Sequence, residues 1–200
     1  YKRLNTLINH QKNVFYLHSL KIMDSFINVA TEELETFHLI TILVLRNTSL
    51  FRIPPSISNL HHLAILDLSK NPITTINNIS FYQNHKLYSL DLSFTNLSHL
   101  TQNIFLGNGN LTLLYLHHTR IDKFHSNAFT GLDSLQVLDI SSMSTSVESF
   151  SNTQIFGSLS MLYELYVMYQ EVCCLIPEAT CQYNFQSQDI LFSCVNIISS

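Results

Sequence analysis

Residues 63–73 read LAILDLSKNPI, and the spacing of their apolar residues decides the fold. Leucines at positions 63, 66 and 68 are followed by the amide of Asn71 and by Ile73. The alternation of leucines around Asp67 predicts a short β-strand whose leucines point inward and whose other side chains point outward. One strand of this length cannot bury its apolar face alone, so further copies are expected to stack beside it.

The same pattern, L-x-x-L-x-L-x-x-N-x-L, recurs along most of the chain. Its copies are spaced by 23, 23, 24, 24, 24 and 27 residues and begin at Leu17, Ile40, Leu63, Leu87, Leu111, Leu135 and Leu162. This length and pattern are typical of leucine-rich repeats. They predict an α/β-type leucine-rich-repeat solenoid, with short parallel strands on a concave face and irregular, short helical or 3-10 segments on the convex face. We expect about seven repeats over residues 17–172, after a poorly matching start of a truncated array at residues 1–16.

The asparagine position of the pattern should carry a buried polar side chain that bonds to the backbone of the following turn. Asn71 keeps the amide, and threonine replaces it at Thr48, Thr95 and Thr119. A threonine hydroxyl can accept one backbone bond and donate another. We therefore expect the threonines to act as equivalents of the asparagine, with slightly looser stacking.

A second apolar line lies on the return segments between the strands. Phe81, Phe105 and Phe129 each stand 18 residues after the first leucine of their repeat. Because the period is constant, these rings should stack as a phenylalanine spine in the core. This placement favours a structural role for the rings over a cofactor site.

Composition excludes several classes of function. The chain has 46% hydrophobic and 12% charged residues, a net charge of −4, and only ten Lys and Arg, which are scattered singly, so a nucleic-acid-binding surface is not indicated. It holds no G-x-S-x-G motif, no phosphate-binding loop and no apolar run of about 18 residues. We therefore expect no enzyme activity, no cofactor and no bound metal, and we interpret the chain, which does not begin with Met, as a fragment of a longer protein.

All four cysteines, Cys173, Cys174, Cys181 and Cys194, fall within residues 173–200. Their spacing lacks the C-x-x-C pairs typical of zinc sites, whereas an even number of clustered cysteines predicts disulfides and an extracellular setting. Adjacent cysteines rarely bridge each other, so the first two are expected to bond in some order to the last two. Residues 173–200 are thus predicted to form a disulfide-rich cap or hinge that closes the end of the solenoid.

Residues 165–198 carry a resemblance to a known family. The run Glu171-Val172-Cys173-Cys174-Leu175-Ile176-Pro177, the later Cys181 and the run Phe192-Ser193-Cys194-Val195-Asn196 resemble the hinge of leucine-rich-repeat-containing G-protein-coupled receptors, such as relaxin-like and glycoprotein-hormone-like receptors. The resemblance implies that seven membrane helices follow and that the chain lies on the extracellular face of the plasma membrane. It also implies that a relaxin-like, insulin-like or cystine-knot hormone is the ligand, and that a G protein couples only through the absent membrane domain.

The outward strand positions line the expected ligand-binding face. The central outward column should read Lys21, Val44, Asp67, Asp91, Tyr115, Asp139 and Tyr166, and the neighbouring column Met23, Arg46, Ser69, Ser93, His117, Ser141 and Met168. We take Asp67, Asp91, Tyr115, His117, Asp139 and Tyr166 as candidate binding residues for a basic peptide, because relaxin-like hormones present arginines to acidic residues of their receptors. The alternative is that Leu-Asp-Leu-Ser is only a common filling of a solvated strand. The pairs His61-His62 and His117-His118 do not indicate a metal site, since neighbours in a strand point to opposite faces.

Four glycosylation sequons occur, at Asn47, Asn78, Asn96 and Asn110. Their number is about what chance predicts, so they do not indicate a compartment. If the chain is secreted, Asn78, on a predicted loop, is the best candidate acceptor.

Three functional classes fit these observations. The first is the extracellular ligand-binding region of a leucine-rich-repeat G-protein-coupled receptor. The second is a secreted or single-pass repeat protein for adhesion or innate recognition. The third, an intracellular scaffold, leaves the clustered cysteines unexplained.

Overall fold

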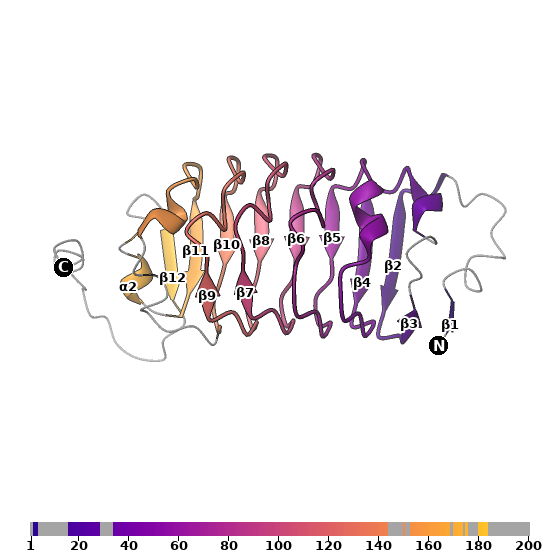
Figure 1. The fold of residues 1–200 in the computed structure, drawn as a ribbon, viewed down its shortest axis with the longest axis horizontal. Helices are drawn as coiled ribbons and strands as arrows, with labels where there is room; N and C mark the ends of the chain where they lie inside the picture. The colour runs from indigo at the N-terminus through magenta and orange to yellow at the C-terminus, as the bar shows by residue number, and fades with distance from the viewer. Residues whose placement is uncertain are drawn as a thin grey trace.

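The structure is a computed structural model that describes residues 2–3, 16–28, 34–143, 150, 153–168, 170–173, 175 and 180–183. Successive turns of the chain stack side by side into an elongated solenoid, with the N-terminal turns at one end and the C-terminal turns at the other (Figure 1). Most of the serine-rich stretch that follows Ile140, residues 144–149, lies outside the described residues.

One parallel sheet runs along the whole stack. Its eight strands are β2 (Ser19–Met23), β4 (Ile42–Arg46), β5 (Ile65–Asp67), β6 (Ser89–Asp91), β8 (Leu113–Tyr115), β10 (Val137–Asp139), β11 (Glu164–Val167) and β12 (Thr180–Tyr183), and they pair in that order. Every pairing in this sheet is parallel. The repeat strands keep their inward leucines in register, as Leu43, Leu66, Leu90 and Leu114 show, whereas the last pairing sets Leu165 opposite Cys181. The predicted solenoid of short parallel strands is therefore confirmed. The sheet also extends past residue 172 by one strand, β12, that the repeat pattern did not predict.

The return segments between the strands hold little regular structure, as expected. They include the short helices η2 (Glu35–Phe37), η3 (Pro55–Asn59), η5 (Thr153–Phe156) and α2 (Gln170–Cys173). Two small parallel sheets pair β1 (Lys2–Arg3) with β3 (Ile27–Asn28), and β7 (His99–Leu100) with β9 (Lys123–Phe124). No helix among the described residues is long and apolar enough to cross a membrane.

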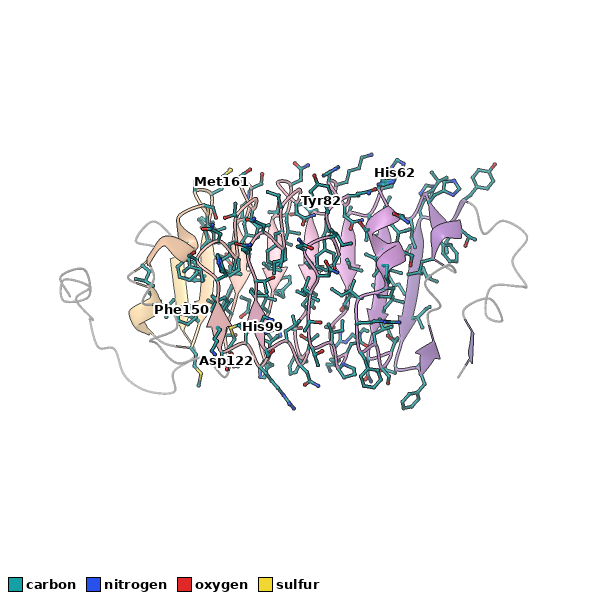
Figure 2. The ribbon with its side chains drawn as sticks, viewed as in Figure 1. His62, Tyr82, His99, Asp122, Phe150 and Met161 are labelled. Atoms are coloured by element: carbon teal, nitrogen blue, oxygen red, sulfur yellow. The ribbon has the colours of Figure 1, made fainter. Side chains whose placement is uncertain are left out.

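A single core of leucine, isoleucine and phenylalanine side chains fills the space between the sheet and the return segments (Figure 2). The predicted phenylalanine positions, Phe81, Phe105 and Phe129, are fully buried. The rings of Phe105 and Phe129 are nearly parallel, with centroids 6.5 Å apart, and Phe156 continues the stack 6.0 Å beyond Phe129. This spine fixes the spacing of the return segments to that of the strands.

The buried polar position behaves differently from the prediction. Asn71 bonds to the preceding turn, not the following one: its Oδ1 accepts the backbone N–H groups of Thr48 and Leu50 at 2.9 and 3.0 Å, and its Nδ2 donates to the carbonyl of Leu45 at 2.7 Å. Asn71 bonds to the preceding turn because its amide lies within hydrogen-bonding distance of two backbone N–H groups and one backbone carbonyl of that turn.

The threonines at this position are not equivalents of the asparagine. The hydroxyl of Thr95 donates to the carbonyl of Leu92, in its own turn, at 2.8 Å. That of Thr119 is buried and has no hydrogen-bond partner among the described residues. Thr48 donates to Leu45 in its own turn at 2.9 Å and reaches another turn only through the amide of Asn71, at 3.2 Å. A hydroxyl is too short to bridge two turns of the stack, so the bridge is lost where threonine stands.

Two further buried asparagines, Asn84 and Asn108, lie on the return segments and were not predicted. The Nδ2 of Asn84 donates to the carbonyls of Ile57 and Leu60 at 2.9 and 3.0 Å, and that of Asn108 donates to Phe81 and Asn84 at 2.9 and 3.3 Å. Both side chains are fully buried, and neither Oδ1 accepts a bond from the described residues. These amides join successive turns on the side of the stack opposite the sheet.

Candidate functional site

The outer face of the sheet presents the predicted columns of side chains. Strand register places Lys21 beside Val44, then Asp67, Asp91, Tyr115, Asp139 and Tyr166. The central column therefore continues from β2 to β11 without a break in register. We call this surface the outer sheet face.

Each of the three aspartates in this column closes a small turn with the serine two residues later. The Oδ1 of Asp67, Asp91 and Asp139 accepts the backbone N–H of Ser69, Ser93 and Ser141 at 2.9, 2.8 and 3.0 Å, and their hydroxyls at 2.6 Å. Such bonds to a carboxylate are short and strong. One oxygen of each aspartate is thus used to shape the strand exit; the other, Oδ2, is left for further contacts in Asp67 and Asp91 and faces His117 in Asp139.

The residue after this position, which is a serine in three turns and His117 in the fourth, adopts a left-handed backbone. The φ angles are 58° at Lys70, 56° at Phe94, 55° at His118 and 52° at Ser142. This turn lets the backbone N–H continue the parallel ladder: Lys70 donates to the carbonyl of Ser93 and Phe94 to that of His117, both at 2.9 Å. The side chains at this position consequently form a regular row along the edge of the outer sheet face, which we call the exit row.

Aromatic and basic side chains meet in the exit row, which the sequence did not predict. The rings of Phe94 and His118 stack with centroids 4.4 Å apart and an interplanar angle of 14°. The Nζ of Lys70 lies 5.5 Å from the centroid of the Phe94 ring, a cation–π distance. The 24-residue spacing of these positions could have indicated that they lie side by side. Their left-handed backbone could not be predicted, because only Gly, Asn and Asp commonly adopt it.

His117 belongs to the same cluster and contacts the acidic column. Its Nδ1 lies 3.0 Å from the Oδ2 of Asp139, although the two atoms are not aligned for a hydrogen bond. The ring also meets Phe94 edge to face, with centroids 5.3 Å apart. The structure therefore brings His117 together with one predicted aspartate, Asp139, and gives that carboxylate a partner that is charged only when protonated.

Burial changes the pKa of one aspartate in the acidic column, Asp91. Desolvation raises the pKa of Asp91, and the neighbouring carboxylate of Asp67 raises it further, while the bonds from Ser93 and the charge of His117 oppose the shift. The two aspartates are in register on adjacent strands, so their negative charges repel each other without a cation between them.

The tyrosines of the central column are neutral hydrogen-bonding groups. Burial, followed by the charges of Asp91 and Asp139, raises the pKa of Tyr115. Donation of the Tyr166 hydroxyl to Oε2 of Glu164, at 2.8 Å, raises the pKa of Tyr166. Glu164 was not among the predicted site residues; it lies one residue before a leucine, where the pattern places a variable side chain.

The other predicted groups lie away from this column. Cys173 is half-buried against the core and disulfide-bonded, whereas the placement of Cys174, Cys194 and the side chain of Cys181 lies outside the described residues, so the pairing remains a prediction. Asn47, Asn78 and Asn110 are exposed, and Asn96 is half-buried. His61 and His62 are exposed, with His62 3.2 Å from the Nζ of Lys86, and the described residues contain no group of three metal-ligating side chains.

Comparison with solved structures supports the fold. The chain is similar to one in the crystal structure of the TLR13–ssRNA13 complex, with a TM-score of 0.60 and 22% identity over 86% of this chain and 26% of that one. It is also similar to one in the Toll–Spatzle complex of Drosophila, with a TM-score of 0.62 and 19% identity over 72% of this chain and 18% of that one. At this identity the likeness shows the fold alone, and the chain spans only about a quarter or less of either structure. No curated protein sequence matches it.

The repeat pattern itself matches a protein family. Residues 38–97 and 85–142 match the leucine-rich-repeat family, and these overlapping segments contain the strands that carry Asp67, Asp91, Tyr115 and Asp139. Together they span more than half of the chain. The protein therefore belongs to the leucine-rich-repeat family.

Proposed function

We propose that the outer sheet face binds a protein or peptide ligand that presents basic side chains, and that the chain is part of a receptor-type extracellular region. The observation that carries the proposal is the acidic column. Three aspartates each hold Oδ1 in a structural turn. Asp67 and Asp91, which are adjacent and repel each other, leave Oδ2 for a partner, whereas the Oδ2 of Asp139 lies 3.0 Å from Nδ1 of His117. A lysine or arginine of a ligand would relieve that repulsion.

Exposed aromatic and sulfur-containing side chains around the column support a protein ligand. Tyr88 and Tyr163, which directly precede strands, are 48% and 64% exposed, and Met168, which follows β11, is 44% exposed. Tyrosine and methionine are enriched in protein–protein interfaces, where they supply contact area at low entropic cost. These residues flank Tyr115 and Tyr166, so apolar and acidic contacts are offered on one surface.

The ligands of the structurally similar proteins are of two kinds. One of those complexes contains a single-stranded RNA, and the other contains Spatzle. Recognition of RNA depends on cationic groups opposite phosphates, whereas the outer sheet face carries aspartates and this chain has a net charge of −4. The charge therefore favours a basic protein or peptide over RNA as the ligand.

Two kinds of receptor are compatible with this binding face. The resemblance of residues 165–198 to the hinge of leucine-rich-repeat G-protein-coupled receptors supports a hormone-binding region followed by seven membrane helices. The similarity to the chains of the Toll–Spatzle and TLR13 complexes supports a single-pass or secreted recognition protein. The coding sequence after residue 200 distinguishes them: seven apolar segments of about 20 residues indicate the first, and one or none the second.

The binding proposal is tested with a nona-arginine peptide as the probe. Changing Asp67, Asp91 and Asp139 together to asparagine removes the charges but keeps the Oδ1 atoms that accept the serine bonds, so the fold is preserved. We expect peptide affinity, measured by isothermal titration calorimetry, to fall about tenfold or more.

The control is Asp133→Asn, which removes the same charge from an exposed residue on a return segment. It should leave the affinity within twofold. Unchanged binding in the triple variant, or an equal loss in the control, would contradict the proposal.

A further inference from the structure

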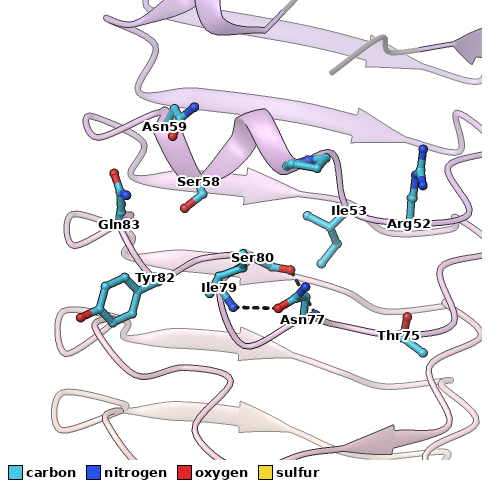
Figure 3. Close-up of a pocket in the computed structure, with 11 residues that line it drawn as sticks. Arg52, Ile53, Ser58, Asn59, Thr75, Asn77, Ile79, Ser80, Tyr82 and Gln83 are labelled. Atoms are coloured by element: carbon cyan, nitrogen blue, oxygen red, sulfur yellow. Dashed lines mark hydrogen bonds between the residues drawn. The ribbon is translucent and has the colours of Figure 1, made fainter. Parts of the chain in front are cut away.

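A hollow of about 660 Å³ opens on the return side of the stack, away from the outer sheet face. It lies between η3 and the return segment of the next turn; Figure 3 shows Arg52 and Thr75 at one end and Asn59, Gln83 and Tyr82 at the other. Its volume is in the range of sites that hold small organic ligands. The outer sheet face is on the opposite side of the sheet, so the hollow plays no part in the binding proposed above.

The lining of the hollow combines one aromatic ring with amides and hydroxyls. Tyr82 is 48% exposed and shares its end of the hollow with the amides of Asn59 and Gln83. The lining also includes the hydroxyls of Ser58 and of Thr75, the latter at the opposite end. Amides and hydroxyls can each donate and accept hydrogen bonds. Together with the flat apolar face of a ring, they match a sugar, which has hydroxyls around its rim and C–H groups on its faces.

A glycosylation sequon stands at the edge of this hollow. Asn77 and Ile79, on either side of Asn78, both line it, and Ser80 completes the sequon. The turn is fixed by its own bonds: the N–H of Ile79 donates to Oδ1 of Asn77 and the N–H of Asn77 donates to Oγ of Ser80, both at 3.1 Å (Figure 3). The N–H of Ser80 also donates to the Asn77 carbonyl, at 2.9 Å. Asn78 therefore lies at the tip of an ordered turn, directly beside the sugar-compatible surface.

The other sequons lack this combination. The Nδ2 of Asn47 donates to Asp24 at 2.8 Å, that of Asn110 donates to the carbonyl of His85 at 2.7 Å, and Asn96 is half-buried. Asn78 is exposed, and its amide makes no hydrogen bond to the described residues. Among the four sequons, Asn78 is thus the one whose acceptor nitrogen is both exposed and without a hydrogen bond to the described residues, since Asn96 also lacks such a bond but is half-buried.

We propose that Asn78 carries an N-linked glycan whose first sugars lie in the hollow against Tyr82, held by hydrogen bonds to Asn59 and Gln83. The sugars would cover the exposed apolar surface of Ile79 and Tyr82, which are 62% and 48% exposed in the bare chain. The proposal rests on the extracellular setting that the proposed function includes. It adds a second built surface, on the face of the solenoid that does not bind the ligand.

The test measures how fast each glycan is removed from the natively folded, full-length protein made in glycosylating cells. Peptide:N-glycosidase converts a released asparagine to aspartate, so peptide mass spectrometry follows each site separately. Because the enzyme needs an accessible glycan, we expect release at Asn78 to be about tenfold slower than at Asn110, equivalent to about 1.4 kcal/mol for local opening. After denaturation the two rates should agree.

Variants of Tyr82 test whether contact with the hollow causes the slow release of the glycan at Asn78. Tyr82→Ser should bring release at Asn78 to the rate of Asn110, whereas Tyr82→Phe, which keeps the ring, should leave it slow. The matched control is Leu106→Ser: Leu106 follows Phe105 as Tyr82 follows Phe81, is 44% exposed and does not line the hollow.

The outcomes separate the two proposals. An unmodified Asn78 in a protein glycosylated elsewhere, or a Tyr82→Ser variant with unchanged release, overturns the glycan site and leaves the proposed function standing. A protein that carries no glycan at any sequon overturns the extracellular setting as well.

Discussion

The first turns of this solenoid are joined by more buried amides than the turns that follow. The side chain of Asn71 makes six hydrogen bonds at the exits of the strands, four of them to the preceding turn and two within its own. Asn84 joins the same two turns on the return side, whereas the turn of Thr95 keeps only the return-side bridge of Asn108 and the turn of Thr119 has Leu132 at that position. The comparison teaches that a repeat array can lose its amide bridges one at a time while the leucine ladder continues.

The largest expected effect is the loss of the bridge at Asn71. In an Asn71→Ala variant the buried N–H groups of Thr48 and Leu50 and the carbonyl of Leu45 lose their partner. We expect the free energy of unfolding, measured by urea denaturation, to fall by about 3–5 kcal/mol. Hydrogen exchange should rise first at β4 and β5, because turns of a solenoid contact only their neighbours.

The matched control is Thr119→Val at the same position of the repeat. The hydroxyl of Thr119 is buried without a partner, so replacing it with a methyl group of similar shape should be neutral or stabilising by about 1 kcal/mol. Equal destabilisation by the two substitutions would show that threonine and asparagine stabilise the stack equally at this position of the repeat.

A smaller effect is expected on the return side, at Asn108. Asn108→Leu removes the donor to the carbonyls of Phe81 and Asn84, but it also removes an Oδ1 that accepts no bond. Leucine already occupies this position one turn later, at Leu132. We expect a loss of about 1–2 kcal/mol by the same denaturation measurement. A loss as large as that at Asn71 would mean that the bridge on the return side is the stronger of the two.

The smallest effect is the dependence on pH that Asp91 contributes. Its pKa is raised in the folded chain, so its stabilising contribution is complete below the ordinary aspartate pKa and is lost as the pH rises through the raised value. Asp91→Asn should therefore flatten the stability profile over this acidic range, while the bonds from Ser93 are kept. Thermal unfolding at a series of pH values checks this, with Asp133→Asn as the control. A profile that Asp91→Asn leaves unchanged would remove the electrostatic argument for the acidic column.

The length of the repeat was enough to predict the strands and their register. With a constant repeat, strand register follows from counting, and the central column from Lys21 to Tyr166 was found this way. Contacts that depend on side-chain reach were not predictable: the direction of the Asn71 bonds was wrong, and the expected equivalence of Thr95 was wrong. The role of Asn84 and the hollow beside Asn78 depend on how irregular segments of adjacent turns approach each other, and no spacing in the sequence encodes that. The stacking of Phe94 on His118 follows the 24-residue spacing, but their left-handed backbone carries no side-chain signature.

The exit row has a consequence for how this protein could change over time. Six of its members, Asp24, Asn47, Lys70, Phe94, His118 and Ser142, adopt a left-handed backbone although none is glycine. Their chemistry differs from turn to turn while their backbone is the same, since the ladder beneath them fixes it. Mutation can thus exchange an acid, an amide, a base or a ring at regular intervals along one edge without disturbing the leucines below. Such an edge lets an array acquire a new specificity one turn at a time.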